Sequence, residues 1–178
     1  KVFDYAKSNI KNDFLDIYFC AKCSFIITNG TGIDSISHIF RRPMIFTDHA
    51  PLAFMISYSP NVITLTKKLF CNNKKKYLNL KEILSHPTSG SLKIDDYKKY
   101  KLEFHDNTKE EIKDAVFELL NEIRGNYSLR NKNKDLHKKF WKIFVNQISN
   151  NNSLRKYHKS INSIYSTKFL INNQDWFL

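Results

Sequence analysis

The stretch from Cys23 to Leu52 constrains the fold of this chain more than any other part of the sequence. It opens with an uninterrupted apolar run, Phe25 to Ile27, which passes into the polar and flexible residues Thr28 to Gly32. A helical pattern follows, in which apolar residues recur at three-to-four spacing on one side: Ile33, Ile36 and Ile39-Phe40. Arg41-Arg42-Pro43 ends that pattern, and a second apolar run begins at Met44. The order of strand, short helix and strand predicts a βαβ unit.

A βαβ unit favours a ligand site at the carboxyl ends of its strands, where the helix also presents unpaired N–H groups. Thr28 to Gly32 and Thr47 to Leu52 are therefore expected to line one rim. Glycines let the backbone approach a ligand closely, and a phosphate suits the first helical turn electrostatically. The alternative is an ordinary strand-to-helix turn made by Asn29 and Gly30, with Thr31 or Asp34 as the helix cap.

Length and composition indicate a folded protein with one domain and an appendage. The chain has 178 residues, of which 42% are hydrophobic and 14% aromatic. No apolar run approaches the roughly 20 residues that span a bilayer, and residues 1–9 lack the core of a signal peptide. Because the chain begins at Lys1, we expect it to be part of a longer protein.

The formal net charge of +12 is compatible with nucleic acid, an anionic membrane surface or anionic substrates as partners. Lysine supplies most of this charge, in Asn-Lys runs such as residues 72–76 and 131–134 that are typical of solvated loops in an AT-rich genome. We therefore do not expect nucleic acid as a partner. Two of the five arginines, Arg41 and Arg42, lie at the helix end opposite the predicted rim, where solvated surface is the favoured interpretation.

The three cysteines do not form a disulfide framework or a metal site by their spacing. Cys20-x-x-Cys23 has no second pair of ligands at zinc spacing, and it closes a helix, whereas a redox pair opens one. We therefore expect these cysteines to be unpaired side chains that pack in the fold of a protein from a reducing cytoplasm. No Asp-x-Asp metal motif occurs, so we expect neither a metal nor a cofactor.

The rest of the chain alternates between helical and strand patterns. A helix is expected over residues 11–22, with Phe14, Ile17, Tyr18 and Ala21 on the face that packs against the first strand. Thr108-x-x-Glu111 is a capping box that opens a long helix, and Gly125 follows the end of that helix. Asp95-Asp96 is expected in a loop. The other expected elements are strands at 62–65 and 102–105 and helices at 80–85 and 136–148.

This alternation predicts an α/β fold with a parallel sheet and flanking helices. Residues 1–125 are expected to form a Rossmann-like domain, and the composition becomes polar and charged after Gly125. Residues 126–178 are expected to form a helical C-terminal extension. Its closing aromatic residues, Trp176 and Phe177, predict that it packs back on this domain or on another one.

The stretch from Cys23 to Leu52 resembles the donor-binding half of GT-B glycosyltransferases. Asn29-Gly30-Thr31-Gly32, a helix of fixed length and then Arg42-Pro43 are similar to the Asn-Asp-Thr-Gly and Gly-x-Pro signature of the heptosyltransferases. Most of the chain looks like the C-terminal part of a bacterial glycosyltransferase family from surface-polysaccharide gene clusters. The resembling pieces are DFLDIYFCAKCSFIITNGTGIDSI, RRPMIF, YLNLKEIL, FHDNTKEEIKDAV and STKFLINNQDWFL.

The resemblance implies the C-terminal half of a GT-B fold that binds a nucleotide sugar. The residues that would contact the donor are Asn29, Gly30, Thr31 and Gly32, with Asp34 and Ser35 at the helix start and Asp48 and His49 after the second strand. Asp48 and His49 have an alternative role as a turn that caps the next segment. The catalytic base and the acceptor site would lie in an N-terminal domain outside this chain, so no catalytic residue is assigned.

The same resemblance implies a glycan or lipid-linked acceptor, a role in polysaccharide biosynthesis and a cytoplasmic location with peripheral contact at the inner membrane. Two alternatives remain open: a nucleotide-sugar 2-epimerase of GT-B architecture, and a non-enzymatic basic module that binds RNA or anionic lipid. Salt dependence separates the last alternative, because binding to a phosphate backbone weakens steeply with salt. A dinucleotide-dependent dehydrogenase is disfavoured because G-x-G-x-x-G is incomplete: Ser35 stands at its last glycine.

Overall fold

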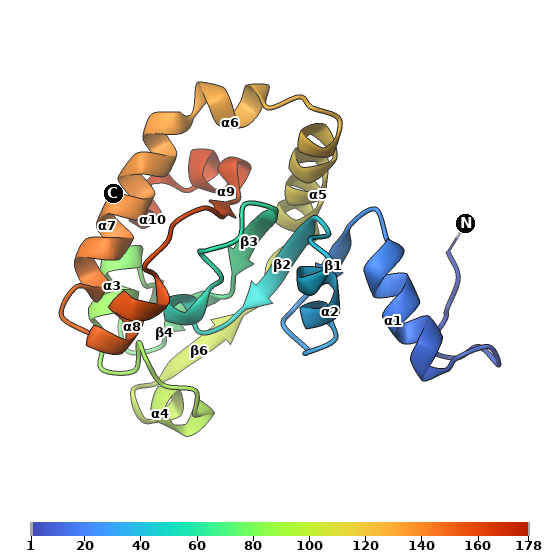
Figure 1. The fold of residues 1–178 in the computed structure, drawn as a ribbon. Coiled ribbons are helices and arrows are strands. Elements are labelled where there is room, and N and C mark those ends of the chain that lie inside the picture. The colour runs from blue at the N-terminus through green and yellow to red at the C-terminus, as the bar shows by residue number, and fades with distance from the viewer. Residues whose placement is uncertain (1, 178) are drawn as a thin grey trace.

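A sheet of four parallel strands organises the computed structural model, which describes residues 2–177 (Figure 1). The strand order is β1 (Ile26–Thr28), β2 (Met44–His49), β3 (Val62–Thr66) and β7 (Ile164–Tyr165). β1 and β2 pair in parallel with Ile26 opposite Met44, and α2 (Asp34–Ile39) connects them. The predicted α/β fold and the βαβ unit are therefore confirmed, and the helices that flank the sheet make the fold Rossmann-like.

A second sheet of three antiparallel strands adjoins the first. Its order is β5 (Lys76–Tyr77), β4 (Lys68–Cys71) and β6 (Leu102–His105). The sequence predicted β6 but treated the stretch around Lys74 as a basic loop. That stretch is the hairpin turn between β4 and β5, in which Lys75 adopts a φ of +50°.

The long helix α5 (Lys109–Ile123) packs against β2 and β3 and begins with the predicted capping box. Thr108 accepts a hydrogen bond from the Glu111 N–H, and the Glu111 carboxylate accepts one from the Thr108 N–H. Gly125 follows the end of the helix with a φ of +77°, a conformation that glycine adopts easily. The remaining helices are α1 (Asp13–Lys22), η1 (Leu52–Phe54), α3 (Leu80–Ser85), α4 (Ile94–Lys99), α6 (Ser128–Lys132), α7 (Lys134–Ile148), α8 (Asn152–Tyr157), α9 (Thr167–Asn172) and α10 (Gln174–Phe177).

The segment after Gly125 shares one core with the preceding residues. It contributes β7, which pairs with β3, in addition to the helices α6 to α10. Phe177 is 1% exposed, and the Trp176 ring stacks on Tyr165 at 5.6 Å between ring centroids. The expected helical extension thus contains a strand of the main sheet. The sequence did not predict β7, because a strand of two residues, both buried, is too short to give a strand pattern.

The predicted buried faces of α1 and α2 were mostly wrong, although Ala21 in α1 is buried as expected. Phe14 in α1 is 70% exposed and Ile39 in α2 is 76% exposed. The buried side of α2 carries Asp34 and Ser37, and the Ser37 hydroxyl donates to the Cys20 carbonyl at 2.9 Å. α1 therefore packs on α2 through small and polar groups, at the outer margin of the molecule (Figure 1).

The prediction that Asp95-Asp96 lies in a loop was also wrong, because both residues belong to the first turn of α4. Carboxylates are favourable there, since the N-terminus of a helix carries partial positive charge. Along residues 2–177, every helix falls short of the length and apolar character that crossing a bilayer requires.

Candidate functional site

The carboxyl ends of β1 and β2 bring together two segments that the sequence predicted to share a rim. A Cβ built on Gly30, in the turn after β1, would lie 3.8 Å from Nδ1 of His49 and 3.9 Å from Cε1 of Phe46. His49 is the last residue of β2. Gly30 and His49 are therefore in van der Waals proximity although 19 positions separate them in the printed sequence.

The turn between β1 and α2 is open to solvent and depends on its glycines. Gly30 and Gly32 adopt φ values of +86° and +90°, which side chains with a Cβ rarely adopt. The Gly30 N–H donates to the Thr28 hydroxyl at 3.1 Å, and the Gly32 carbonyl accepts from the Ser35 N–H at 3.0 Å. Five of the predicted contacts at this turn are exposed: Asn29, Gly30, Thr31, Gly32 and Ser35.

Asp34 differs from the other predicted contacts because its side chain is buried. It is 7% exposed, and its Oδ1 has no hydrogen-bond partner among the described residues. Ile33 is the N-cap of α2 and makes no side-chain cap, so neither Thr31 nor Asp34 caps this helix. The Asp34 side chain is thus a buried polar group in the first turn of α2 and does not face the exposed surface of the turn.

His49 is a titratable group beside the turn. Burial lowers its pKa below the ordinary value of 6.5, while a backbone contact with Phe54 and the charge of Asp34 act in the opposite direction. The imidazole is therefore neutral at pH 7. Its Nε2 is buried without a hydrogen-bond partner within residues 2–177, and its ring packs edge-on against Phe46.

Asp48 is held by a residue that sequence reasoning did not single out, Asn107. The Asp48 N–H donates to the Asn107 side chain at 2.8 Å, and the Asn107 N–H donates to the Asp48 carboxylate at 2.5 Å. Asp48 also adopts a φ of +52°, so this exchange holds a strained turn in place. No local sequence signal identifies the pair, because 59 positions separate its members.

A pocket of about 300 Å³ opens at the carboxyl ends of β2 and β3, next to His49. The N–H of Lys67, which lines this pocket, donates to the His49 carbonyl at 3.0 Å. The other walls are mainly apolar and come from the segment after β2, from α4 with its preceding loop, and from β6: Ala50, Pro51, Ser91, Leu92, Ile94, Tyr97 and Phe104. Asn29 to Gly32 do not line this pocket and form the open surface on the other side of His49.

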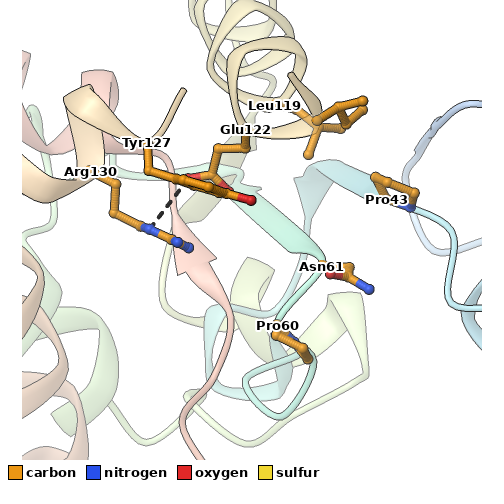
Figure 2. Close-up of a pocket in the computed structure, with 8 residues that line it drawn as sticks. Pro43, Pro60, Asn61, Leu119, Glu122, Tyr127 and Arg130 are labelled. Carbon is orange, nitrogen blue, oxygen red and sulfur yellow. Dashed lines mark ion pairs between the residues drawn. The ribbon is translucent and has the colours of Figure 1, made fainter. Parts of the chain in front are cut away.

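A second pocket, of about 450 Å³, lies at the opposite edge of the sheet (Figure 2). Pro43 and Asn61, which precede β2 and β3, line it together with the end of α5. Figure 2 shows Arg130 and Tyr127 beside the Glu122 carboxylate, and the Arg130 Nε lies 3.4 Å from that carboxylate. Burial raises the pKa of Glu122, and the Arg130 guanidinium acts against this increase. No sequence pattern singled out Glu122, Tyr127 or Arg130.

The described residues contain no group of three or more His, Cys, Asp or Glu side chains placed to hold a metal ion. Cys20 is buried, which raises its thiol pKa, and the Cys23 thiol donates to the Cys20 carbonyl. The two cysteines therefore take part in local packing at the end of α1.

Three comparisons with known proteins found no match to this chain. No protein-family model matches the chain, and neither a curated protein nor a solved structure matches it.

Proposed function

We propose that this chain binds the nucleotide-sugar donor of a glycosyltransferase, and that its sheet is the C-terminal half of a GT-B fold. The observation that carries the proposal is that Gly30 and His49 are neighbours at the carboxyl ends of adjacent parallel strands. Ligands of open α/β sheets bind outside these strand ends, where the first βα turn receives the phosphates.

The turn from Asn29 to Gly32 has the properties that a diphosphate requires. It is exposed, its two left-handed glycines leave the backbone accessible, and it leads into the N-terminus of α2. In sugar transfer the diphosphate leaves with negative charge, so fixed N–H dipoles at the leaving group lower the barrier. The role of this chain would be to hold the leaving group.

The adjoining 300 Å³ pocket supports a place for the rest of the donor. Its walls are mostly apolar, and the Lys67 side chain at its edge forms an ion pair with Asp106. A nucleoside or sugar in this pocket would lie next to Ala50 and Pro51, which follow His49 in the chain. The neutral imidazole of His49 could exchange hydrogen bonds with the donor without adding charge. The acceptor and the catalytic base would come from a second domain that covers the open turn.

Calorimetric titration with UDP-, GDP-, ADP- and CMP-sugars tests this function. The proposal predicts saturable one-to-one binding that selects one nucleotide and changes less with salt than binding to RNA does. RNA binding that weakens steeply with salt, together with no preference among the nucleotide sugars, would refute it. A 2-epimerase would show the same donor binding, and product analysis with the complete protein would separate epimerised sugar from transferred sugar.

A further inference from the structure

A pocket of about 500 Å³ lies at the end of α2, at the amino ends of β2 and β3. This is the edge opposite to the contact between Gly30 and His49. The lining residues come from the end of α2 and from the loop before β3: His38, Ile39, Arg41, Arg42, Tyr58, Ser59, Pro60 and Asn61. The lining contains two arginines and no acidic residue.

The two guanidinium groups are not used to hold the fold together. The end of α2 is closed by backbone groups, because the Arg41 N–H donates to the His38 carbonyl and the Arg42 N–H donates to the Ser37 carbonyl. Within residues 2–177, neither arginine side chain forms an ion pair or a hydrogen bond to a protein group. The Nε of Arg42 is moreover buried, and a buried donor without an acceptor is costly.

Arg41 occupies a backbone position at which glycine would be less strained. Its φ is +53°, in the left-handed region that residues with a Cβ rarely adopt. The Arg41 carbonyl accepts a hydrogen bond from the Asn61 side chain, which ties this turn to the loop before β3. The backbone therefore holds Arg41 and Arg42 on the same side of a fixed turn.

The pocket also has an apolar side. The Tyr58 ring packs edge-on against His38 with ring centroids 5.4 Å apart, and Ile39 is 76% exposed. Pro60 and Asn61 also line the 450 Å³ pocket, so the two pockets adjoin at these residues, which Figure 2 labels. In that second pocket the Glu122 carboxylate lies 3.4 Å from the Arg130 Nε.

We propose that this pocket binds a phosphoryl group carried on an apolar or aromatic body. Arg41 and Arg42 would bind the phosphoryl oxygens, since the planar guanidinium matches that geometry and forms paired charge-assisted hydrogen bonds. The body of the ligand would contact Tyr58 and Pro60. This site is separate from the proposed donor site, because it lies at the other edge of the sheet.

Two probes distinguish the sources of such a ligand. Phenyl phosphate represents a soluble phosphomonoester, and phosphatidylcholine vesicles with phosphatidic acid represent a lipid headgroup. We expect saturable binding to at least one of them, with phenol and pure phosphatidylcholine vesicles as controls that lack the phosphoryl group. If neither probe binds more tightly than its control, the proposal is wrong.

Arginine variants localise the binding. Arg41→Gln and Arg42→Gln should each weaken the binding of the responsive probe about tenfold or more, because each removes charge-assisted hydrogen bonds. Arg155→Gln, at an exposed position in α8, removes the same charge and should change binding less than about twofold. Equal losses in all three variants would show that only net charge matters and would overturn the site.

Two controls separate this result from unfolding and from the donor site. Arg41 is exposed, so Arg41→Gln tests the site even if Arg42→Gln, at a partly buried position, lowers stability. Gly32→Ala, at the opposite edge, should leave binding of the responsive probe unchanged. A loss in Gly32→Ala that equals the loss in Arg41→Gln would place the probe at the donor turn instead.

Discussion

Asp48 and Asn107 hold each other through two reciprocal hydrogen bonds, each running from a backbone N–H to the other residue's side chain. The Asn107 amide also donates to the Thr66 carbonyl at 3.0 Å. One asparagine therefore joins the ends of β2 and β3 to the segment before α5. This junction fixes the backbone next to His49, and with it the position of the proposed donor site.

Replacing Asn107 with alanine should lower the free energy of unfolding by about 2–4 kcal/mol, because the two hydrogen bonds of its side chain are lost and the Asp48 N–H and the Thr66 carbonyl lose their partner. Urea denaturation measures this change. Asn131→Ala is the matched control: Asn131 is exposed on α6, and its replacement should change stability by less than about 0.5 kcal/mol. A loss in Asn107→Ala no greater than that of the control would show that the junction contributes little.

Glu118 should make stability depend on pH. It is 3% exposed, and burial raises its pKa to about 7, although hydrogen bonds from the Thr167 N–H and hydroxyl act to lower it. Its ordinary pKa is 4.5, so the folded state binds the proton more tightly than the unfolded state does. The tighter proton binding by Glu118 in the folded state stabilises the protein fully below about pH 4.5, and this stabilisation is lost as pH rises through about 7.

Glu118→Gln removes that titration. The free energy of unfolding of the variant, relative to the unmodified protein, should therefore rise by about 1–3 kcal/mol between pH 5 and pH 8. The variant must be compared with the unmodified protein at each pH, because His137 also titrates. His137 contacts the Thr167 hydroxyl, and burial is the main cause that lowers its pKa to about 4. The contribution of His137 to stability therefore increases with pH, opposite to that of Glu118. A relative stability that stays constant across this range would contradict the raised pKa of Glu118.

Alanine substitutions at Gly32 and Gly125 separate the effect of backbone strain on stability from the effect on nucleotide-sugar binding. Both have positive φ values, +90° and +77°, and a Cβ at either position would meet no atom within 4 Å. Alanine at each position should therefore cost about 1–2 kcal/mol of stability from backbone strain alone. Only Gly32→Ala should also weaken nucleotide-sugar binding, by about fivefold or more in a calorimetric titration.

Gly90→Ala completes this series, because Gly90 has the same open surroundings without a positive φ. Its stability should change by less than about 0.5 kcal/mol. Unchanged affinity in Gly32→Ala would remove the turn from the donor site, even with the expected loss of stability.

Local patterns predicted the elements that are defined by neighbouring residues. The apolar runs and the intervening glycines located the βαβ unit, and Thr108 with Glu111 located the start of α5. The hydrophobic spacing in α2 predicted the wrong buried face. The apolar residues were expected to be buried, but the buried residues of this helix are Asp34 and Ser37. Burial there depends on a hydrogen bond to Cys20, which periodicity does not encode.

Long-range pairings were beyond the reach of sequence patterns. β7 joins β3 across about a hundred residues and is two residues long, so it carries no strand signal of its own. The hairpin of β4 and β5 was hidden by its lysine-rich turn. The topology of the βαβ unit predicted the rim, and the structure brings Gly30 close to His49 there. Asn107, which holds Asp48 at this rim, could not be predicted because the two residues are 59 positions apart.

Backbone amide chemical shifts during a nucleotide-sugar titration test the central claim most directly. If the glycine turn holds the diphosphate, the largest changes should occur at the N–H groups of Thr31, Gly32 and Ile33 and at His49, and they should saturate together. Saturable binding with its largest changes at residues outside the carboxyl edge of the sheet, and none at this turn, would contradict the account.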